Sequence, residues 1–393
     1  MSFIINVPEH AAAVIDRLGK SGCEAFAVGG CVRDSLLGLT PNDWDVTTSA
    51  EPEKVMEIFG GAPFKAVPTG IEHGTVTVVC DGQPIEVTTY RIDGKYSDGR
   101  HPGSVKFTSS LEADLARRDF TVNAMAYSPK VGLVDPFCGR DDLSAEVIRC
   151  VGKAERRFSE DALRIMRALR FSAVLGFSIE EKTGAAAKKL ASNLDLISRE
   201  RVYSELSKLV CGVNSPAVIR NYRDVLSKVA PVCDCSAVSE RLIEIGERRN
   251  LPLMYAALLC GTDAEAALRG LKADKRTIQR VCAILSRAWA DSYLGAKKLC
   301  AVCGVDIARE IQLLAYARGE IGLDALGFID TIVGRGECVS VKQLKIDGGE
   351  LRAMGIKPAR IGEALSGLLG EVICGRIPNE RSSLALFAAK NYL

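Results

Sequence analysis

A change in hydrophobic pattern near residue 150 sets the strongest limit on how this chain folds. Before it, runs rich in Val, Ile and Thr at 25–28, 75–79 and 84–90 alternate with amphipathic segments at 8–20 and 51–59, which predicts strands packed against helices. Beyond it, strand patterns are scarce and apolar residues recur at helical spacing, with Gly, Pro, Asn and Asp between segments. We therefore expect an α+β protein, with a mixed-sheet head followed by an all-α chain that has no fixed repeat.

The cysteine and histidine contents argue against a zinc-binding protein. The chain has 14 cysteines but only three histidines, and Cys300 and Cys303 are the single pair with C-x-x-C spacing. A structural zinc site requires four such ligands at suitable spacing. We therefore expect reduced, mostly buried thiols in a cytoplasmic protein.

Charge and hydropathy leave the partner open but argue against a membrane. The net charge of +2 neither requires nor excludes a nucleic acid, and the segment 149–170 is locally basic. No run of about 18 apolar residues is present. The N-terminal residues lack the basic-then-apolar pattern of a signal sequence, so no membrane partner is expected.

Two aspartates in GGCVRDSLLGLTPNDWDVTT, residues 29–48, are candidate metal ligands. If WDVTT is a strand, Asp43 and Asp45 lie on one face and Trp44 packs on the other. Neighbouring carboxylates repel, and Mg²⁺ binds through one or two carboxylates plus substrate phosphates. Glu86, in a later predicted strand, would complete a set of three acids for two metals if the strands are neighbours. The alternative is that the aspartates are ordinary turn acids.

The glycine turn that precedes these acids is a candidate phosphate site. Gly29 and Gly30 follow a predicted strand and lead into a predicted helix that contains Arg33. Such a turn lets backbone N–H groups and a guanidinium approach a phosphate. It is not a Walker loop, because no Gly-Lys-Ser/Thr sequence follows.

The segment LARRDFTVNAMAY, residues 115–127, supplies further candidate nucleotide ligands. Arg118 would bind phosphate, Asp119 would orient it or a sugar hydroxyl, and Asn123 lies four residues on. The alternative is a capped helix end with a solvated arginine pair.

The segment SEDALRIMRALRF predicts one helix with charged residues at steps of three. At 100° per residue, Asp161, Arg164, Arg167 and Arg170 form a slow spiral rather than a straight row. Asp161 and Arg164 would then face a base edge, while the later arginines would lean toward phosphates or brace the helix. The alternative is an ordinary helical salt bridge, worth about 0.3–0.5 kcal/mol.

Taken together, these segments resemble one family, the class II tRNA nucleotidyltransferases, which comprises CCA-adding enzymes and bacterial poly(A) polymerases. The matching pieces occur in the family's order and cover residues 25 to about 210. They are AVGGCVRDSLLG, NDWDVTT, IEVTTYR, RRDFTVNAMA, LVDPFCGRDDL, SEDALRIMRALRF and SRERVYSEL. Residues 344–379 also resemble the C-terminal segment of the CCA-adding branch.

The resemblance implies a polymerase β-like nucleotidyltransferase head with a helical neck, body and tail, at 1–150, 151–211, 212–343 and 344–393. Body and tail would grip the acceptor and T arms of tRNA, and no protein partner is implied. The resemblance also implies a role for each candidate residue. Asp43 and Asp45 would bind Mg²⁺, Glu86 would support catalysis, and the nucleotide would be bound by Gly30, Arg33, Arg118, Asp119 and Asn123. Asp161 and Arg164 would read the base, Arg167 and Arg170 would complete that pocket, and the neck would be braced by Glu200, Arg201 and Glu205.

The implied activity is template-independent addition of CCA to the 3′ end of tRNA from CTP and ATP, with release of pyrophosphate. The pattern of Tyr96, Asp98, Arg100 and Pro102 resembles the flexible loop of members that add CCA or A. Addition of A only, or poly(A) synthesis, is the alternative within the family. A catalytically inactive RNA-binding protein is disfavoured by the intact acids, and a small-molecule nucleotidyltransferase by the long helical tail.

Overall fold

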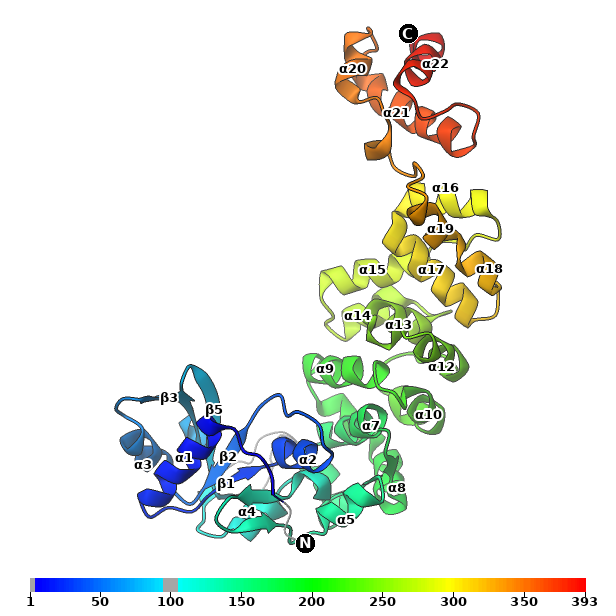
Figure 1. Ribbon diagram of the computed structural model, residues 1–393. Helices are drawn as coiled ribbons and strands as arrows, with labels where there is room; N and C mark the ends of the chain where they lie inside the picture. The colour runs from blue at the N-terminus through cyan, green and yellow to red at the C-terminus, as the bar shows by residue number, and fades with distance from the viewer. Residues whose placement is uncertain (1–3, 95–104) are drawn as a thin grey trace. The chain divides into compact units, whose positions relative to one another are not determined.

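The computed structural model describes residues 4–94 and 105–393, and the chain forms two compact units, Met1–Ala230 and Pro231–Leu393 (Figure 1). The loop pattern from Tyr96 to Pro102 lies outside the described residues. The predicted boundaries at 150, 211 and 343 are finer than this division and stay predictions.

The first unit is built on a seven-stranded mixed sheet in the order β3-β4-β5-β2-β1-β8-β9. Neighbouring strands are antiparallel except for β2 and β5, which are parallel. The predicted mixed sheet is therefore confirmed. Its strands are β1 (Ala25–Val28), β2 (Asp45–Thr48), β3 (Phe64–Gly70), β4 (Thr75–Cys80), β5 (Gln83–Thr89), β8 (Ala126–Ser128) and β9 (Gly132–Val134).

Two amphipathic helices, α1 (Glu9–Lys20) and α3 (Pro52–Ile58), pack on the sheet (Figure 1). In α1, Val14 and Leu18 are four residues apart and fully buried, which is the spacing of one helix face. Proline at the first position of α3 costs no intrahelical hydrogen bond, because that N–H has no partner in a helix.

The rest of the first unit is mostly helical and follows or flanks the sheet. The remaining α-helices and strands are α2 (Gly30–Leu36), β6 (Arg91–Asp93), β7 (Val105–Phe107), α4 (Leu111–Ala116), α5 (Gly139–Ser144), β10 (Val147–Ile148), α6 (Ala154–Glu160), α7 (Leu163–Leu175), β11 (Ser178–Ile179), α8 (Glu181–Lys189), α9 (Arg199–Val210), α10 (Ser215–Asn221) and α11 (Arg223–Leu226).

Two local predictions are wrong at element boundaries. Strand β2 begins at Asp45, so Asp43 and Trp44 precede the strand instead of lying on it. The helix predicted through SEDALRIMRALRF is broken, because Asp161 has extended backbone angles between α6 and α7. Its carboxylate accepts a hydrogen bond from the N–H of Leu163 at 3.0 Å, which supplies a partner for the start of α7.

The second unit consists of helices and contains no strand among its residues, all of which are described. Helix α13 is apolar on all sides and is buried against α12, α15 and α17. The predicted all-α region is confirmed. Its α-helices are α12 (Ser236–Glu244), α13 (Leu251–Leu259), α14 (Ala264–Gly270), α15 (Lys275–Leu285), α16 (Tyr293–Cys303), α17 (Val305–Ala317), α18 (Leu323–Leu326), α19 (Phe328–Gly334), α20 (Gly348–Ala353), α21 (Pro358–Ile373) and α22 (Arg381–Tyr392).

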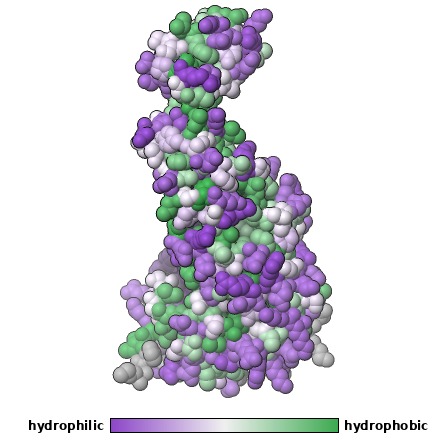
Figure 2. Space-filling model, turned by 90° about the vertical axis from the view of Figure 1, so that its right-hand side faces the viewer, coloured by the Kyte–Doolittle hydropathy of each residue, from purple (hydrophilic) through white to green (hydrophobic). Residues whose placement is uncertain are grey.

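Within the described parts of the chain, no helix has both the length and the apolar character needed to span a membrane. Hydrophilic and hydrophobic residues are interspersed on the face seen in Figure 2. The cysteines are free thiols, most of them buried or half-buried, and Cys300 and Cys303 both lie in α16.

Candidate active site

The parallel pairing of β2 and β5 brings two of the predicted acids together. Asp45 is the direct partner of Glu86 in this register, although the two residues are far apart in sequence. Partners on adjacent strands project from the same face of a sheet. Both side chains are exposed, whereas Val46 and Val87, the next pair along, are buried. The structure therefore places two carboxylates side by side on the solvent face, with Asp43 just before the strand.

The electrostatics around these acids favour a bound cation. The pKa of Asp45 is raised to about 6, first because neighbouring protein atoms displace part of its hydration shell and second because Glu86 and Asp43 repel its charge. Arg118 acts in the opposite direction. A divalent cation between the acids would relieve this repulsion.

The acids do not form a complete metal cage. Among residues 4–94 and 105–393, no group of three or more His, Cys, Asp or Glu side chains is arranged to hold a metal ion. Mg²⁺ usually binds through one or two carboxylates and completes its shell with water and substrate phosphates. Asp43 and Asp45 fit that mode, and their role as metal ligands stays a prediction.

The glycine turn makes room for an arginine from another element. Gly29 has a φ of +79°, a conformation that glycine adopts without steric cost. A Cβ atom at Gly29 would lie 3.1 Å from Nη1 of Arg118, so a side chain there would crowd the guanidinium. Gly30 begins α2, and Arg33 lies in the same helix. The turn and both arginines are therefore neighbours in the structure.

Asp114 is a charged residue that the sequence analysis missed. It is fully buried, and its carboxylate receives hydrogen bonds from Nε of Arg117 at 2.9 Å and Oγ1 of Thr47 at 3.2 Å. It also forms an ion pair with Arg118 at 3.5 Å and accepts the N–H of Arg91. The carboxylate thus ties the acid strand β2 to the arginines that follow α4. The sequence does contain a pattern that indicates these ion pairs, because Asp114 precedes the arginines by three and four residues, the spacing of ion pairs on a helix.

A chain of hydrogen bonds joins α2 to α7. Nη1 of Arg33 donates to Oδ1 of Asn123 at 2.7 Å, and Nδ2 of Asn123 donates to Oδ1 of Asp119 at 3.1 Å. Nε of Arg167 donates to Oδ2 of Asp119 at 2.6 Å. Burial opposes ionisation of Asp119, but Arg167 and Arg164 outweigh it and lower its pKa to about 2. Four predicted residues therefore form one network, in which Arg33, Asn123 and Asp119 are buried and Arg167 is half-buried.

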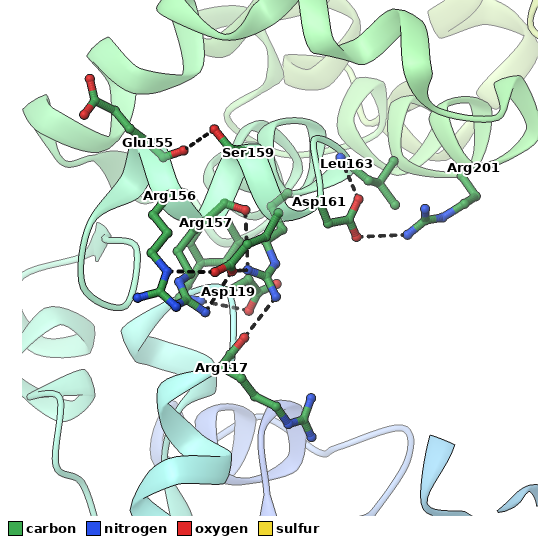
Figure 3. A network of polar contacts seen from close by, with 12 residues as sticks. Arg117, Asp119, Glu155, Arg156, Arg157, Ser159, Asp161, Leu163 and Arg201 are labelled. Atoms are coloured by element: carbon green, nitrogen blue, oxygen red, sulfur yellow. Dashed lines mark hydrogen bonds and ion pairs between the residues drawn. The ribbon is translucent and has the colours of Figure 1, made fainter. Parts of the chain in front are cut away.

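The predicted pair of Asp161 and Arg164 is not a salt bridge in the structure. Arg164 forms an ion pair with Glu160 at 3.0 Å and donates to the carbonyl of Arg117 at 2.9 Å. Asp161 instead forms an ion pair with Arg201 of α9 at 3.1 Å. Figure 3 shows Asp161 directed toward Arg201 and away from Arg117. Each member of the pair therefore already has a protein partner.

Two of the three residues predicted to brace the neck do link α9 to neighbouring segments. Arg201 reaches Asp161 at the joint before α7, and Glu205 forms an ion pair with Arg170 at 2.9 Å. Glu200 is exposed at the first turn of α9. Arg170 therefore lies against α9, in agreement with the alternative that the later arginines brace the helix.

Family comparisons match most of the chain. A Poly A polymerase head domain matches residues 25–149, a probable RNA and SrmB-binding site of polymerase A matches 176–225, and a putative tRNA nucleotidyltransferase domain 2 matches 250–388. Together with the mixed sheet and its paired acids, these matches define a nucleotidyltransferase whose head is of the poly(A) polymerase type.

Similarity to curated proteins extends over nearly the whole chain. The CCA-adding enzyme of Ligilactobacillus salivarius is 36% identical over 401 residues, and that of Latilactobacillus sakei is 37% identical over 406 residues. Each alignment covers 98% of this chain and 98% of the relative. The crystal structure of the Bacillus stearothermophilus CCA-adding enzyme in complex with CTP is 31% identical, with a TM-score of 0.77, and the match covers 97% of this chain and 96% of that one. The chain belongs to the CCA-adding enzyme family.

Proposed function

We propose that this protein adds the sequence CCA to the 3′ end of tRNA, using CTP and ATP and releasing pyrophosphate. The observation that carries the proposal is the end-to-end similarity to CCA-adding enzymes, which includes the helical second unit as well as the catalytic head. A small-molecule nucleotidyltransferase would have no need of a second unit that matches a tRNA nucleotidyltransferase domain.

The proposed reaction is an in-line phosphoryl transfer. The terminal 3′-hydroxyl of the RNA attacks the α-phosphate of the nucleotide, a new phosphodiester bond forms, and the bond to pyrophosphate breaks. Asp43 and Asp45 would hold Mg²⁺, which when bound supplies charge neutralisation at the phosphates. Glu86, beside Asp45 in the register, would support that pair.

The arginines near the glycine turn would hold the triphosphate. Arg33 lies in the helix that Gly30 begins, and Arg118 lies against Gly29. Guanidinium groups bind phosphate oxygens through pairs of charge-assisted hydrogen bonds. Asp119 and Asn123 would fix the direction of Arg33, because the hydrogen bonds described above connect the three residues.

Asp161 and Arg164 are proposed to read the base, with Arg167 and Arg170 beside them. An acceptor next to a donor can match the exocyclic amine and the ring nitrogen that cytosine and adenine both present. Because Asp161 is held by Arg201 and Arg164 by Glu160, base reading would require each side chain to share or exchange a partner.

Replacement of Arg164 by alanine is expected to reduce the selectivity for the correct nucleotide by about ten- to a hundredfold, since one charge-assisted hydrogen bond is worth about 1.5–3 kcal/mol. The measurement is the ratio of incorporation of CTP to UTP and of ATP to GTP. Arg156→Ala is the matched control, because exposed Arg156 forms an ion pair with the same carboxylate of Glu160 at 3.0 Å. Unchanged ratios in the Arg164 variant would mean that the base is read elsewhere.

The domain roles are proposed at the predicted boundaries. Residues 1–150 would be the catalytic head and 151–211 the neck, while 212–343 and 344–393 would bind the acceptor and T arms of tRNA through phosphates and shape. The cytoplasm is the proposed location, where tRNA, CTP and ATP occur together.

The substrate test uses purified protein, Mg²⁺ and a tRNA transcript that lacks its CCA end. With CTP and ATP present, the expected product is extended by C, C and A and then stops. Extension by A alone, and only of tRNA that already ends in CC, would replace the proposal with A addition. Long A runs on unstructured RNA would assign the protein to the poly(A) polymerases.

A further inference from the structure

The ring of Phe171, in α7, is surrounded by three arginine side chains. The guanidinium carbon lies over the ring at 3.9 Å from its centroid for Arg170, 5.1 Å for Arg33 and 5.3 Å for Arg167. The ring is almost fully buried, with 7% of its surface exposed. Arg33 comes from α2, whereas the other two arginines come from α7 itself.

The positive charges of the three arginines are balanced by carboxylates and by the ring itself. Each arginine also forms an ion pair with its own carboxylate: Arg33 with Asp34 at 2.7 Å, Arg167 with Asp119 at 2.6 Å and Arg170 with Glu205 at 2.9 Å. Three cations close together repel one another, and the negative face of an aromatic ring reduces that repulsion. Phe171 is the group that all three arginines share.

A neighbouring aromatic side chain fixes the orientation of the ring. Phe120 packs edge-on against Phe171, with a centroid distance of 5.7 Å and an angle of 80° between the rings. Such T-shaped contacts are a preferred geometry for aromatic pairs. Phe120 is fully buried and adjoins Asp119, so the ring is held by the same segment that pairs with Arg167.

We infer that Phe171 is a positioning residue that sets the separation between the phosphate-side Arg33 and the base-side Arg167 and Arg170. This inference rests on the proposed function. The ring would then do more than fill the core. A bound nucleotide would contact Arg33 through its phosphates and the later arginines near its base. The ring would set the distance between these two groups of arginines. A leucine would fill most of the volume but would offer no negative face.

The test compares Phe171→Leu with Phe158→Leu in the full-length protein. Phe158 is fully buried in the same unit, and no cation–π contact to it is present among the described residues. Both variants lose similar apolar volume, so similar decreases in melting temperature are expected. Only Phe171→Leu is expected to raise the KM for CTP and ATP, by about tenfold, and to weaken selection against UTP and GTP. The KM for tRNA should be unchanged. Phe171→Tyr, which keeps an aromatic ring, should have the same KM for CTP and ATP as the unmodified protein.

Equal nucleotide KM values and equal selectivity in the two leucine variants would overturn the inference, because the ring would then be packing alone. An unmodified protein that incorporates no nucleotide into tRNA would overturn the proposed function and the inference with it. The activity of the unmodified protein therefore separates the two failures.

Discussion

Asp45→Ala should lower the rate of nucleotide incorporation by about 10³-fold or more, since metal-assisted charge stabilisation supplies several kcal/mol of the barrier reduction. Asp45 is the acid that the strand register places beside Glu86, and its pKa is raised first by partial desolvation and second by repulsion from Glu86 and Asp43. Without this carboxylate, the remaining acids offer a divalent cation too few ligands. Single-turnover incorporation of CTP into tRNA measures the effect.

The variant should still bind tRNA within a few-fold of the unmodified protein, because the helical second unit would carry that binding. Asp16→Ala is the control: Asp16 is a half-buried acid of the same unit and forms an ion pair with Lys20 in α1 at 2.6 Å. Near-normal turnover in the Asp45 variant would refute the proposed metal role.

Asp114→Ala should lower the free energy of unfolding by about 3–5 kcal/mol, the usual cost of removing one member of a buried ion pair. The variant would leave Arg117 and Arg118 without their shared carboxylate and would remove one of the two hydrogen-bond acceptors of Thr47. The measurement is urea-induced unfolding followed by circular dichroism at pH 7.

Glu112→Ala is the control for this effect. Glu112 lies in the same short helix α4 but is exposed, so its replacement should change stability by less than about 0.5 kcal/mol. A loss below about 1 kcal/mol for Asp114→Ala would contradict the role of Asp114 as the charge that balances these arginines.

Lowering the pH should reduce the difference in free energy of unfolding between the unmodified protein and the Asp114→Ala variant. Burial opposes ionisation of Asp114, but Arg117 and Arg118 outweigh it and hold its pKa below the ordinary value. A lowered carboxyl pKa adds stability above the pKa of the unfolded chain, and this stability is lost as the pH falls through the lower folded value. The difference in free energy of unfolding should therefore be largest near neutral pH.

The candidate acids could be located from the sequence, whereas their surroundings could not. The Ile, Val and Thr residues made 84–90 a clear strand, and Glu86 was a candidate third acid if that strand neighboured WDVTT. The pairing of β5 with β2 is a long-range contact, and no local pattern encodes which strands become neighbours. The break at Asp161 was missed because no Gly or Pro marks it, and because a side-chain hydrogen bond to Leu163 creates the new helix start.

The arginines show a different limit of sequence reasoning. Their charge and spacing identified Arg33, Arg118 and Arg167 as candidates, but periodicity does not reveal which acid each one meets. Their partners come from other elements or from unexpected positions, as Asp114 and Asp119 show. The surroundings of Phe171 could not be predicted for a similar reason, because a phenylalanine in a helix usually indicates core packing and nothing in its local sequence indicates three neighbouring cations.

Strand β2 occupies the middle of the sheet, with three strands on either side. A central strand has hydrogen-bonded neighbours along both edges and separates from them only when most of the domain unfolds. Asp45 at the start of β2 and Glu86 in the adjoining strand therefore belong to the least mobile part of the first unit. The proposed reaction adds three nucleotides in succession. The growing RNA end would therefore shift at each step relative to acids whose positions do not change. Side chains outside the sheet would make the adjustments between one nucleotide and the next.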